Sequence, residues 1–244
     1  MKFTEIKPYA SLAPFIHAYW ELKGDENDGQ WERNFPDGCP GLVINLGETC
    51  KTDNGLVSMR YGTTYAVGAM TSFNDSFIEK GTHLIGVCLK PAAFSSLYRY
   101  APQHELINST IEFDKPLSFE TGKMIENPVA YLNHFYTNRI GNPDMQLQSV
   151  LTDIRQSKGQ IGIHEVAKHN FITIRQLERK FKTHIGLTPK EYANIIRFRH
   201  ALSIIQNPGE ERSLLEIAFE CGFYDHSHLS NEIKRNTGLA PSQL

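Results

Sequence analysis

The sequence predicts an α+β protein in which a β-rich, barrel-like N-terminal domain with helices precedes an all-α C-terminal domain. Three observations lead to this expectation. Short apolar runs separated by glycine and proline fill the first part of the chain, and a helix-turn-helix pattern occurs twice in the last part. Between them lies Gly141-Asn142-Pro143, which stops a helix and marks the boundary between domains 1–142 and 143–244.

The first part has four runs with the composition of strands: Phe15 to Leu22, Leu42 to Leu46, Leu56 to Val67 and His83 to Leu89. A helix is expected over Ala92 to Tyr100. A second helix should begin at the Asn127-Pro128 cap and continue to Ile140. These patterns predict a small sheet or barrel followed by two helices.

The last part of the chain contains an internal repeat. A shift of 52 residues superposes Leu177 on Leu229, Phe181 on Ile233, Lys182 on Lys234, Gly186 on Gly238, Leu187 on Leu239 and Pro189 on Pro241. A shift of 51 matches Glu165 to Glu216, Val166 to Ile217 and Ala167 to Ala218. The copies therefore differ by one residue in the connection between two short helices, and one small module occurs twice.

Each copy carries the signals of a helix, a tight turn and a second helix. In the second copy the capping box Ser213-x-x-Glu216 opens the first helix. Gly222 then supplies the turn, and Asp225 caps the second helix. This order is typical of a helix-turn-helix unit, which we expect at about 162–186 and again at about 213–238.

The first copy repeats this plan, with the capping box Thr173-x-x-Gln176 before its second helix. Between the copies a longer helix is expected over about 189–206, opened by Thr188-Pro189-x-Glu191 and closed by Asn207-Pro208-Gly209. At 1.5 Å per residue this linker helix would be roughly 27 Å long. That length suits two recognition helices about one DNA turn, ~34 Å, apart.

The bulk composition is that of a globular protein whose two parts differ in charge. The chain has 244 residues, 40% of them hydrophobic, without a signal-peptide or bilayer-spanning run, so we expect a soluble cytoplasmic protein. The net charge of −2 conceals 12 basic against 16 acidic residues in 1–142, and 13 against 11 in 143–244. This cationic excess favours a nucleic-acid partner for the second part but does not prove one.

The cysteines and histidines do not indicate a metal site. The four cysteines, Cys39, Cys50, Cys88 and Cys221, occur without a C-x-x-C pair, which predicts reduced thiols and neither a zinc ribbon nor a disulfide framework. His226 and His228 lie two apart, and residues so spaced on a helix point in different directions. We therefore expect no metal and no cofactor.

With these features, the C-terminal part resembles the DNA-binding domain of the AraC/XylS family of bacterial transcription regulators. The matching residues are Glu165-Val166-Ala167, Gln176-Leu177-x-Arg179-x-Phe181-Lys182, Gly186-Leu187-Thr188-Pro189-x-x-Tyr192, Arg197-x-x-x-Ala201, Ile217-Ala218-x-x-Cys221-Gly222-Phe223, Asp225-x-Ser227, Lys234 and Gly238-Leu239-x-Pro241-Ser242. The resemblance implies a transcription regulator, not an enzyme, with double-stranded DNA and RNA polymerase as partners. It also implies that the second helix of each unit enters the major groove.

Residues near the start of each recognition helix should reach base edges, and basic residues further along should meet phosphate. On the first helix the candidates are Ile174, Arg175, Glu178 and Arg179 for bases, and Lys180 and Lys182 for phosphate. On the second helix they are His226, Ser227, Ser230 and Asn231, with Lys234 and Arg235 near the backbone. The family usually has an aromatic residue in place of Leu229 and an arginine in place of Asn231. The second unit is therefore expected to read less sequence, or to prefer adenine through Asn231.

The N-terminal part is similar to the regulatory domains of the same family, which bind a small effector or mediate dimerisation. Aromatic residues and one arginine form the candidate ligand pocket: Tyr19, Trp20, Trp31, Arg33 and Phe35. Alternatively, these are ordinary core aromatics with Arg33 at the rim. The resemblance thus implies a small-molecule effector, a second copy of the chain, or both as partners.

Two other functions stay open at this point. Cys39 could be the nucleophile of a DNA-associated alkyl-acceptor or repair-type protein, although no histidine or lysine close in the sequence would activate it. The helical part could instead be a scaffold for protein contacts. Metal chemistry of the cupin type is not expected, because the histidines in the first part are isolated: His17, His83 and His104.

Overall fold

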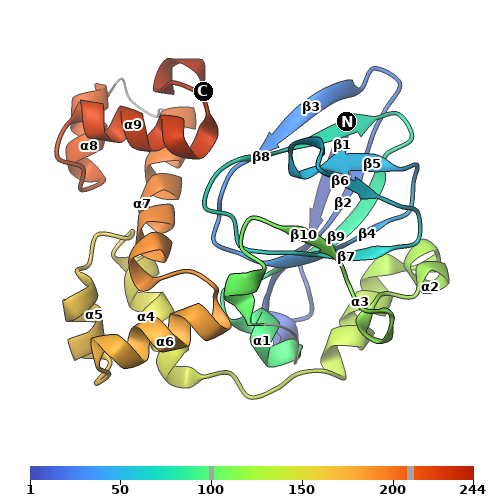
Figure 1. The fold of residues 1–244 in the computed structure, drawn as a ribbon, viewed down its shortest axis with the longest axis horizontal. Coiled ribbons are helices and arrows are strands. Elements are labelled where there is room, and N and C mark those ends of the chain that lie inside the picture. The colour runs from blue at the N-terminus through green and yellow to red at the C-terminus, as the bar shows by residue number, and fades with distance from the viewer. Residues whose placement is uncertain (99–101, 208–211) are drawn as a thin grey trace.

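The computed structural model describes residues 1–98, 102–207 and 212–244, and it confirms the expected α+β class. A six-stranded antiparallel sheet has the order β1-β2-β9-β4-β7-β10, and a four-stranded antiparallel sheet has the order β3-β8-β5-β6 (Figure 1). The strands are β1 (Lys2–Ile6), β2 (Ile16–Lys23), β3 (Gly29–Asn34), β4 (Gly41–Asn45), β5 (Cys50–Thr52), β6 (Val57–Met59), β7 (Thr64–Val67), β8 (Asn74–Glu79), β9 (His83–Leu89) and β10 (Thr110–Glu112).

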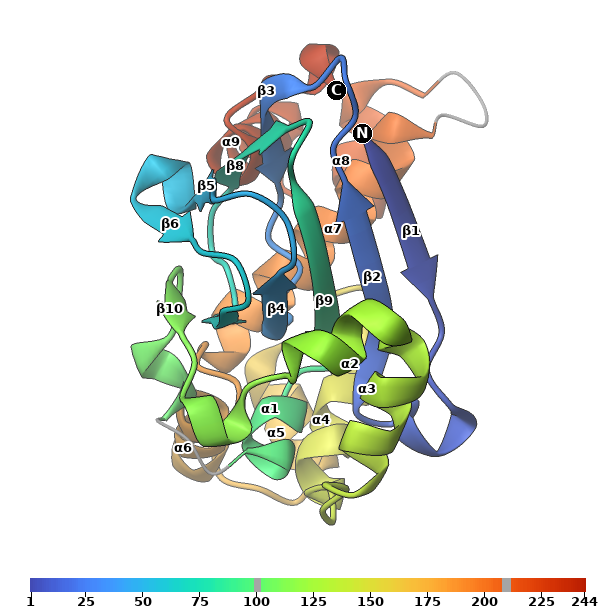
Figure 2. The same cartoon turned by 90° about the vertical axis from the view of Figure 1, so that its right-hand side faces the viewer.

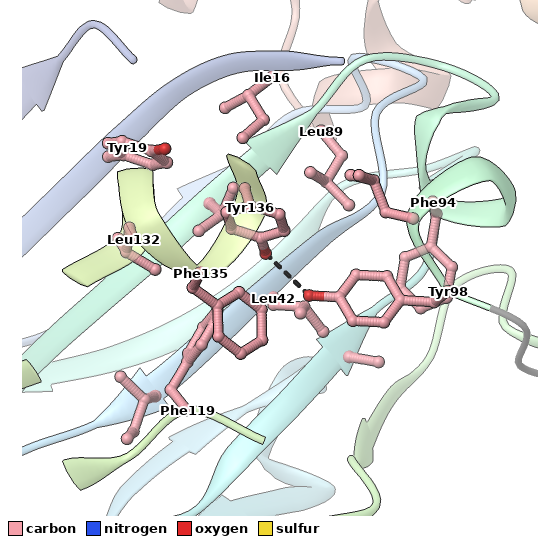
Figure 3. Packing of buried hydrophobic residues seen from close by; sticks show 14 of the residues in the cluster. Ile16, Tyr19, Leu42, Leu89, Phe94, Tyr98, Phe119, Leu132, Phe135 and Tyr136 are labelled. Carbon is pink, nitrogen blue, oxygen red and sulfur yellow. Dashed lines mark hydrogen bonds between the residues drawn. The ribbon is translucent and has the colours of Figure 1, made fainter. Parts of the chain in front are cut away.

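Among the described residues of this region, three α-helices accompany the sheets: α1 (Ala93–Leu97), α2 (Thr121–Glu126) and α3 (Pro128–Thr137). Helices α2 and α3 lie against the lower part of the large sheet in Figure 2. Leu132, Phe135 and Tyr136 of α3 face residues of the sheet, and the Tyr98 hydroxyl donates to the Tyr136 hydroxyl at 3.0 Å (Figure 3). Burying each large apolar side chain contributes roughly 1.5–3 kcal/mol to the stability of the folded protein. Because this cluster holds most of the large buried side chains of the N-terminal region, it is the main core there.

The C-terminal region consists of α4 (Met145–Gln156), α5 (Ile163–His169), α6 (Ile174–His184), α7 (Pro189–Gln206), α8 (Leu214–Glu220) and α9 (His226–Thr237). The expected capping boxes are present at Thr173, Thr188 and Ser213, where each hydroxyl accepts the backbone N–H three residues later. The Asp225 side chain caps α9 in the same way. None of the helices that the structure describes is long and apolar enough to cross a lipid bilayer.

The observed elements differ from the expected ones mainly in the N-terminal region. The run from Leu56 to Val67 contains two strands, β6 and β7, because the chain turns at 60–63 between them. The first expected helix ends at Leu97, since Tyr98 has extended backbone angles, and its expected end at Tyr100 lies outside the described residues. The second begins at Asn127 as expected but ends at Thr137, three residues before Ile140.

Several elements were not anticipated: β1, β3, β5, β8, β10 and α2. Exposed polar side chains dominate β3, whose burial pattern shows no alternation, and β5 and β10 have only three residues each. Such strands are defined by their pairing partners and not by local composition. The expected stop of the linker helix at Asn207 is observed, whereas Pro208 and Gly209 lie outside the described residues.

The turns of the two helix-turn-helix units use the same left-handed backbone but different residues. Gly222 has φ 71° in the second unit, and Phe171 has φ 52° at the corresponding position of the first. A residue with a β-carbon pays roughly 1–2 kcal/mol in this conformation, whereas glycine does not. The Phe171 side chain is 94% exposed, so its packing recovers little of that cost.

Replacing Phe171 with glycine should therefore stabilise the protein by about 0.5–1 kcal/mol, after the greater flexibility of glycine in the unfolded chain is subtracted. The matched change Gly222→Ala should destabilise it by about 1 kcal/mol, because it introduces a β-carbon at positive φ that also meets the Gln160 side chain. Urea denaturation at constant m value measures both changes. Shifts of the midpoint in the same direction for both variants would contradict the explanation by backbone strain.

Candidate nucleic-acid interface

Helix α6 has one buried and one exposed side. Leu177 and Phe181, four residues apart, are fully buried in the cluster that α4, α5 and α7 complete. The opposite side carries four of the predicted contact residues in exposed positions: Arg175, Glu178, Arg179 and Lys182. Since the core fixes the rotation of the helix about its axis, it also fixes which charged side chains face solvent.

Two residues predicted on α6 have additional structural contacts. Ile174 is half-buried and packs against the core cluster of the first unit. The Lys180 ammonium group donates to the carboxylate of Asp144, the residue that caps α4. Desolvation raises the pKa of Asp144, but the hydrogen bonds from Lys180 and from the Leu147 backbone N–H outweigh it. The pKa of Asp144 therefore lies below its usual value. Lys180 thus joins the recognition helix to α4.

Helix α9 repeats this arrangement. Leu229 and Ile233 are fully buried, whereas the predicted contact residues His226, Ser227, Asn231, Lys234 and Arg235 are exposed. Ser230 is half-buried, and its hydroxyl donates to the His226 carbonyl at 2.7 Å. The Arg235 guanidinium donates to Glu232 at 2.5 Å, one turn earlier on the same helix.

Helix α7 belongs to the cores of both units. Tyr192 and Ile195, in its first half, are buried in the cluster of the first unit. Phe198, Ala201 and Leu202, in its second half, are buried in the cluster of the second. Figures 1 and 2 show α6 near one end of this helix and α9 near the other. With 18 residues, α7 is roughly 27 Å long.

The N-terminal region contacts the C-terminal end of each recognition helix. At α6, the Ser95 hydroxyl and His184 Nδ1 are 3.0 Å apart. At α9, Arg33 Nη1 donates to the Thr237 carbonyl at 3.0 Å, while Asp75 and the Phe73 ring hold the same guanidinium. These contacts leave the first turns of both recognition helices exposed.

The five residues predicted to line a ligand pocket do not form one cluster. Tyr19 is buried in the main N-terminal core, and Trp20 packs in a second cluster and stacks on Phe3. Trp31 is exposed and lies against Phe77. The other two contact the second helix-turn-helix unit: Arg33 through Thr237, and Phe35 through the core around α7 to α9. The structure thus does not bring the five side chains together, and ligand binding by any of them stays a prediction.

Cys39 lacks the environment of an activated nucleophile. It is partly buried beside Cys88, and a hydrogen bond with that thiol, burial and the Asp37 carboxylate together raise its pKa well above the usual value. The reactive form of cysteine is the thiolate, which this environment disfavours. The geometry therefore does not favour the alkyl-acceptor hypothesis.

Comparisons with known proteins match two separate parts of the chain. Residues 4–112 match a domain of unknown function (DUF6597), and residues 166–244 match a helix-turn-helix domain. The transcriptional activator RhaS of Klebsiella pneumoniae is 33% identical over 104 residues, which are 42% of this chain and 37% of that protein. RhaS of Escherichia fergusonii is 30% identical over the same shares. The chain thus matches little more than a third of the length of these relatives.

A solved structure of ToxT from Vibrio cholerae shares the fold over the whole chain, with a TM-score of 0.52 at 12% identity, and the match covers 100% of this chain and 97% of ToxT. A second ToxT structure, bound to (E)-4-(8-methylnaphthalen-1-yl)but-3-enoic acid, gives a TM-score of 0.51 at 11% identity over 100% and 98% of the two chains. Residues 166–244, which follow the N-terminal sheets, thus match a helix-turn-helix domain and are similar to part of the RhaS transcriptional activators. These matches support the resemblance of the C-terminal part to the AraC/XylS family.

Proposed function

We propose that residues 143–244 insert α6 and α9 into adjacent major-groove segments of one DNA duplex, and that residues 1–142 modulate this binding. The observation that carries the proposal is the division of each recognition helix. Its apolar side is buried in a core that α7 contributes to, and its polar side is exposed from the first turn onward. An α-helix with this exposure fits the width of the major groove.

The charges on α6 suit both kinds of DNA contact. Arg175 and Arg179 lie four residues apart and therefore on one side of the helix, where each can pair with a guanine. Glu178 can accept from a cytosine amino group, and Lys182 lies beyond them toward phosphate. Lys180 is committed to Asp144, so we assign it a positioning role in addition to any phosphate contact.

The second unit should read fewer bases. Ser227 and Asn231 of α9 share one exposed side, and Asn231 can pair with adenine, while Lys234 and Arg235 lie near the backbone. This helix carries no arginine in its first two turns, in contrast to α6. The first unit therefore supplies most of the sequence discrimination, and the second adds affinity and a weaker preference.

The N-terminal domain is positioned to modulate both units, because it contacts the C-terminal end of each recognition helix. A small-molecule effector or a second copy of the chain that shifts these contacts would change how α6 and α9 are presented. The small acid bound in one ToxT structure of the same fold supports an effector of this kind. Because RhaS relatives are named transcriptional activators, we add RNA polymerase as a partner and the bacterial cytoplasm as the location.

The proposal is tested first by selecting DNA from a random library with the full-length protein. A recovered consensus with two half-sites, bound with an affinity that falls steeply as salt rises, is the expected result. A scaffold for protein contacts predicts neither a consensus nor a difference between selected and scrambled duplexes. Failure to enrich any sequence would therefore reject the proposal in favour of that scaffold.

Two variants of α6 should then separate base from phosphate contacts. Arg179→Ala should lose ~1–3 kcal/mol of discrimination at one position of the selected site and change the preferred base there. Lys182→Ala should weaken all sequences alike and lower the salt slope by about one. Fluorescence anisotropy against the selected and scrambled duplexes measures both effects. Lys51→Ala, an exposed change on β5 of the N-terminal region, is the control. The contact assignment is wrong if both α6 variants bind as this control does.

The contact between the N-terminal domain and α9 gives a separate prediction. Arg33→Ala removes the hydrogen bond to the Thr237 carbonyl and with it ~1 kcal/mol of local stability. The local opening equilibrium at the end of α9 should therefore increase about fivefold. Amide hydrogen exchange around residues 237–239 measures this opening. Arg60→Ala, which removes a surface ion pair with Glu112 elsewhere on the same domain, should leave it unchanged. Equal exchange in the two variants would show that Arg33 does not hold α9.

A further inference from the structure

Three side chains with metal-ligating atoms meet where the sheet approaches the linker helix. Asp37 and Cys39 flank a turn at Gly38 just before β4, and Cys88 lies on the neighbouring strand β9. The pairing of Gly41 with Cys88 in the β4–β9 register brings the turn beside that cysteine. The carboxylate oxygen of Asp37 and the two Sγ atoms all lie within 4.8 Å of one another.

We propose that Asp37, Cys39 and Cys88 form a binding site for one Zn²⁺ ion. Two thiolates and one carboxylate are ligands that zinc accepts, whereas Mg²⁺ and Ca²⁺ prefer oxygen ligands alone. Tetrahedral zinc with Zn–S bonds of about 2.3 Å places two sulfur atoms about 3.8 Å apart. The two sulfur atoms therefore need to approach each other by about 1 Å at most, which rotamer adjustments of the two cysteines can supply.

The surroundings suit the charge of such a complex. Binding releases one proton from each thiol to solvent, so two thiolates, one carboxylate and Zn²⁺ together carry a net charge of −1. The charges of Arg155 on α4, Arg199 on α7 and Lys90 all act on this cluster. They offset the negative charge, and a water molecule completes four-coordination at the partly exposed site.

The local backbone already places two of the ligands. The Cys39 backbone N–H donates to Asp37 Oδ1 at 2.8 Å, which fixes the turn and orients the carboxylate toward the thiols. The absence of a metal motif in the sequence follows from the separation of Cys39 and Cys88 along the chain.

The site lies directly against the linker helix. A β-carbon added at Gly38 would come within 3.0 Å of the Tyr192 ring and 3.8 Å of Ile195, so the turn packs on α7 without space to spare. A metal ion that shifts this turn would therefore act on the helix that joins the two recognition helices. That consequence rests on the proposed function, whereas the binding of the metal does not.

The test uses the reduced full-length protein and needs no DNA. Titration with Co²⁺ should give one equivalent of binding, with near-ultraviolet thiolate-to-cobalt absorption and the visible bands of a tetrahedral site, and Zn²⁺ should displace it. Cys39→Ser and Cys88→Ser should each lower the affinity roughly 100-fold or more, since loss of even outer partners costs 10–100-fold. Cys50→Ser and Cys221→Ser, at buried cysteines outside the cluster, are the matched controls.

Asp37→Asn tests the third ligand without removing the turn, because the amide oxygen can still accept from the Cys39 N–H. It should weaken metal binding while the circular dichroism spectrum and melting temperature of the metal-free protein stay unchanged. The same two measurements verify that the serine variants are folded. Either of two results overturns the proposal: wild-type protein that shows no thiolate-to-cobalt band, or folded Cys39→Ser and Cys88→Ser variants that bind like the controls.

Discussion

The packing of one helix into two cores is the constraint on which the helix-turn-helix half of this protein depends. Tyr192 and Ile195 fix the first half of α7 in one unit, and Phe198 and Leu202 fix its second half in the other. An α-helix of this length resists bending because each turn is held by backbone hydrogen bonds. The separation and relative rotation of α6 and α9 are thereby set inside the protein, before any DNA is present.

The modest charge of the chain fits this arrangement. A protein with a net charge of −2 gains little non-specific affinity from its overall field. The positions of individual cations therefore matter more than their number, and Arg175 and Arg179 lie on the exposed side of α6. If α6 and α9 dock on one duplex as proposed, their rigid presentation lowers the entropic cost of binding. Under that proposal, geometry and not bulk charge makes this half of the chain suited to a duplex.

Local signals in the sequence were sufficient for the helical half but not for the sheets. The capping boxes at Thr173 and Ser213 involve residues three apart, so sequence alone located these helix starts. Strands such as β3 depend on a partner far along the chain, in this case β8, and their own composition carries little information. For the same reason the sequence patterns placed Tyr19 and Phe35 in one candidate pocket, although they lie in different cores. They also did not place Cys39 beside Cys88, which the fold brings together.

The ties between α4 and the first unit make this helix part of the core of that unit. Besides the ion pair from Lys180 to Asp144, Gln146 donates to the Asn170 carbonyl at 3.0 Å, and Asn170 donates to Asp153 at 2.7 Å. Leu147, Val150, Leu151 and Ile154 add the apolar side of α4 to the same core. A truncated version that started at the first helix-turn-helix would leave this core open to water. A fragment meant to keep the α4 side of this core must therefore begin ahead of Asp144.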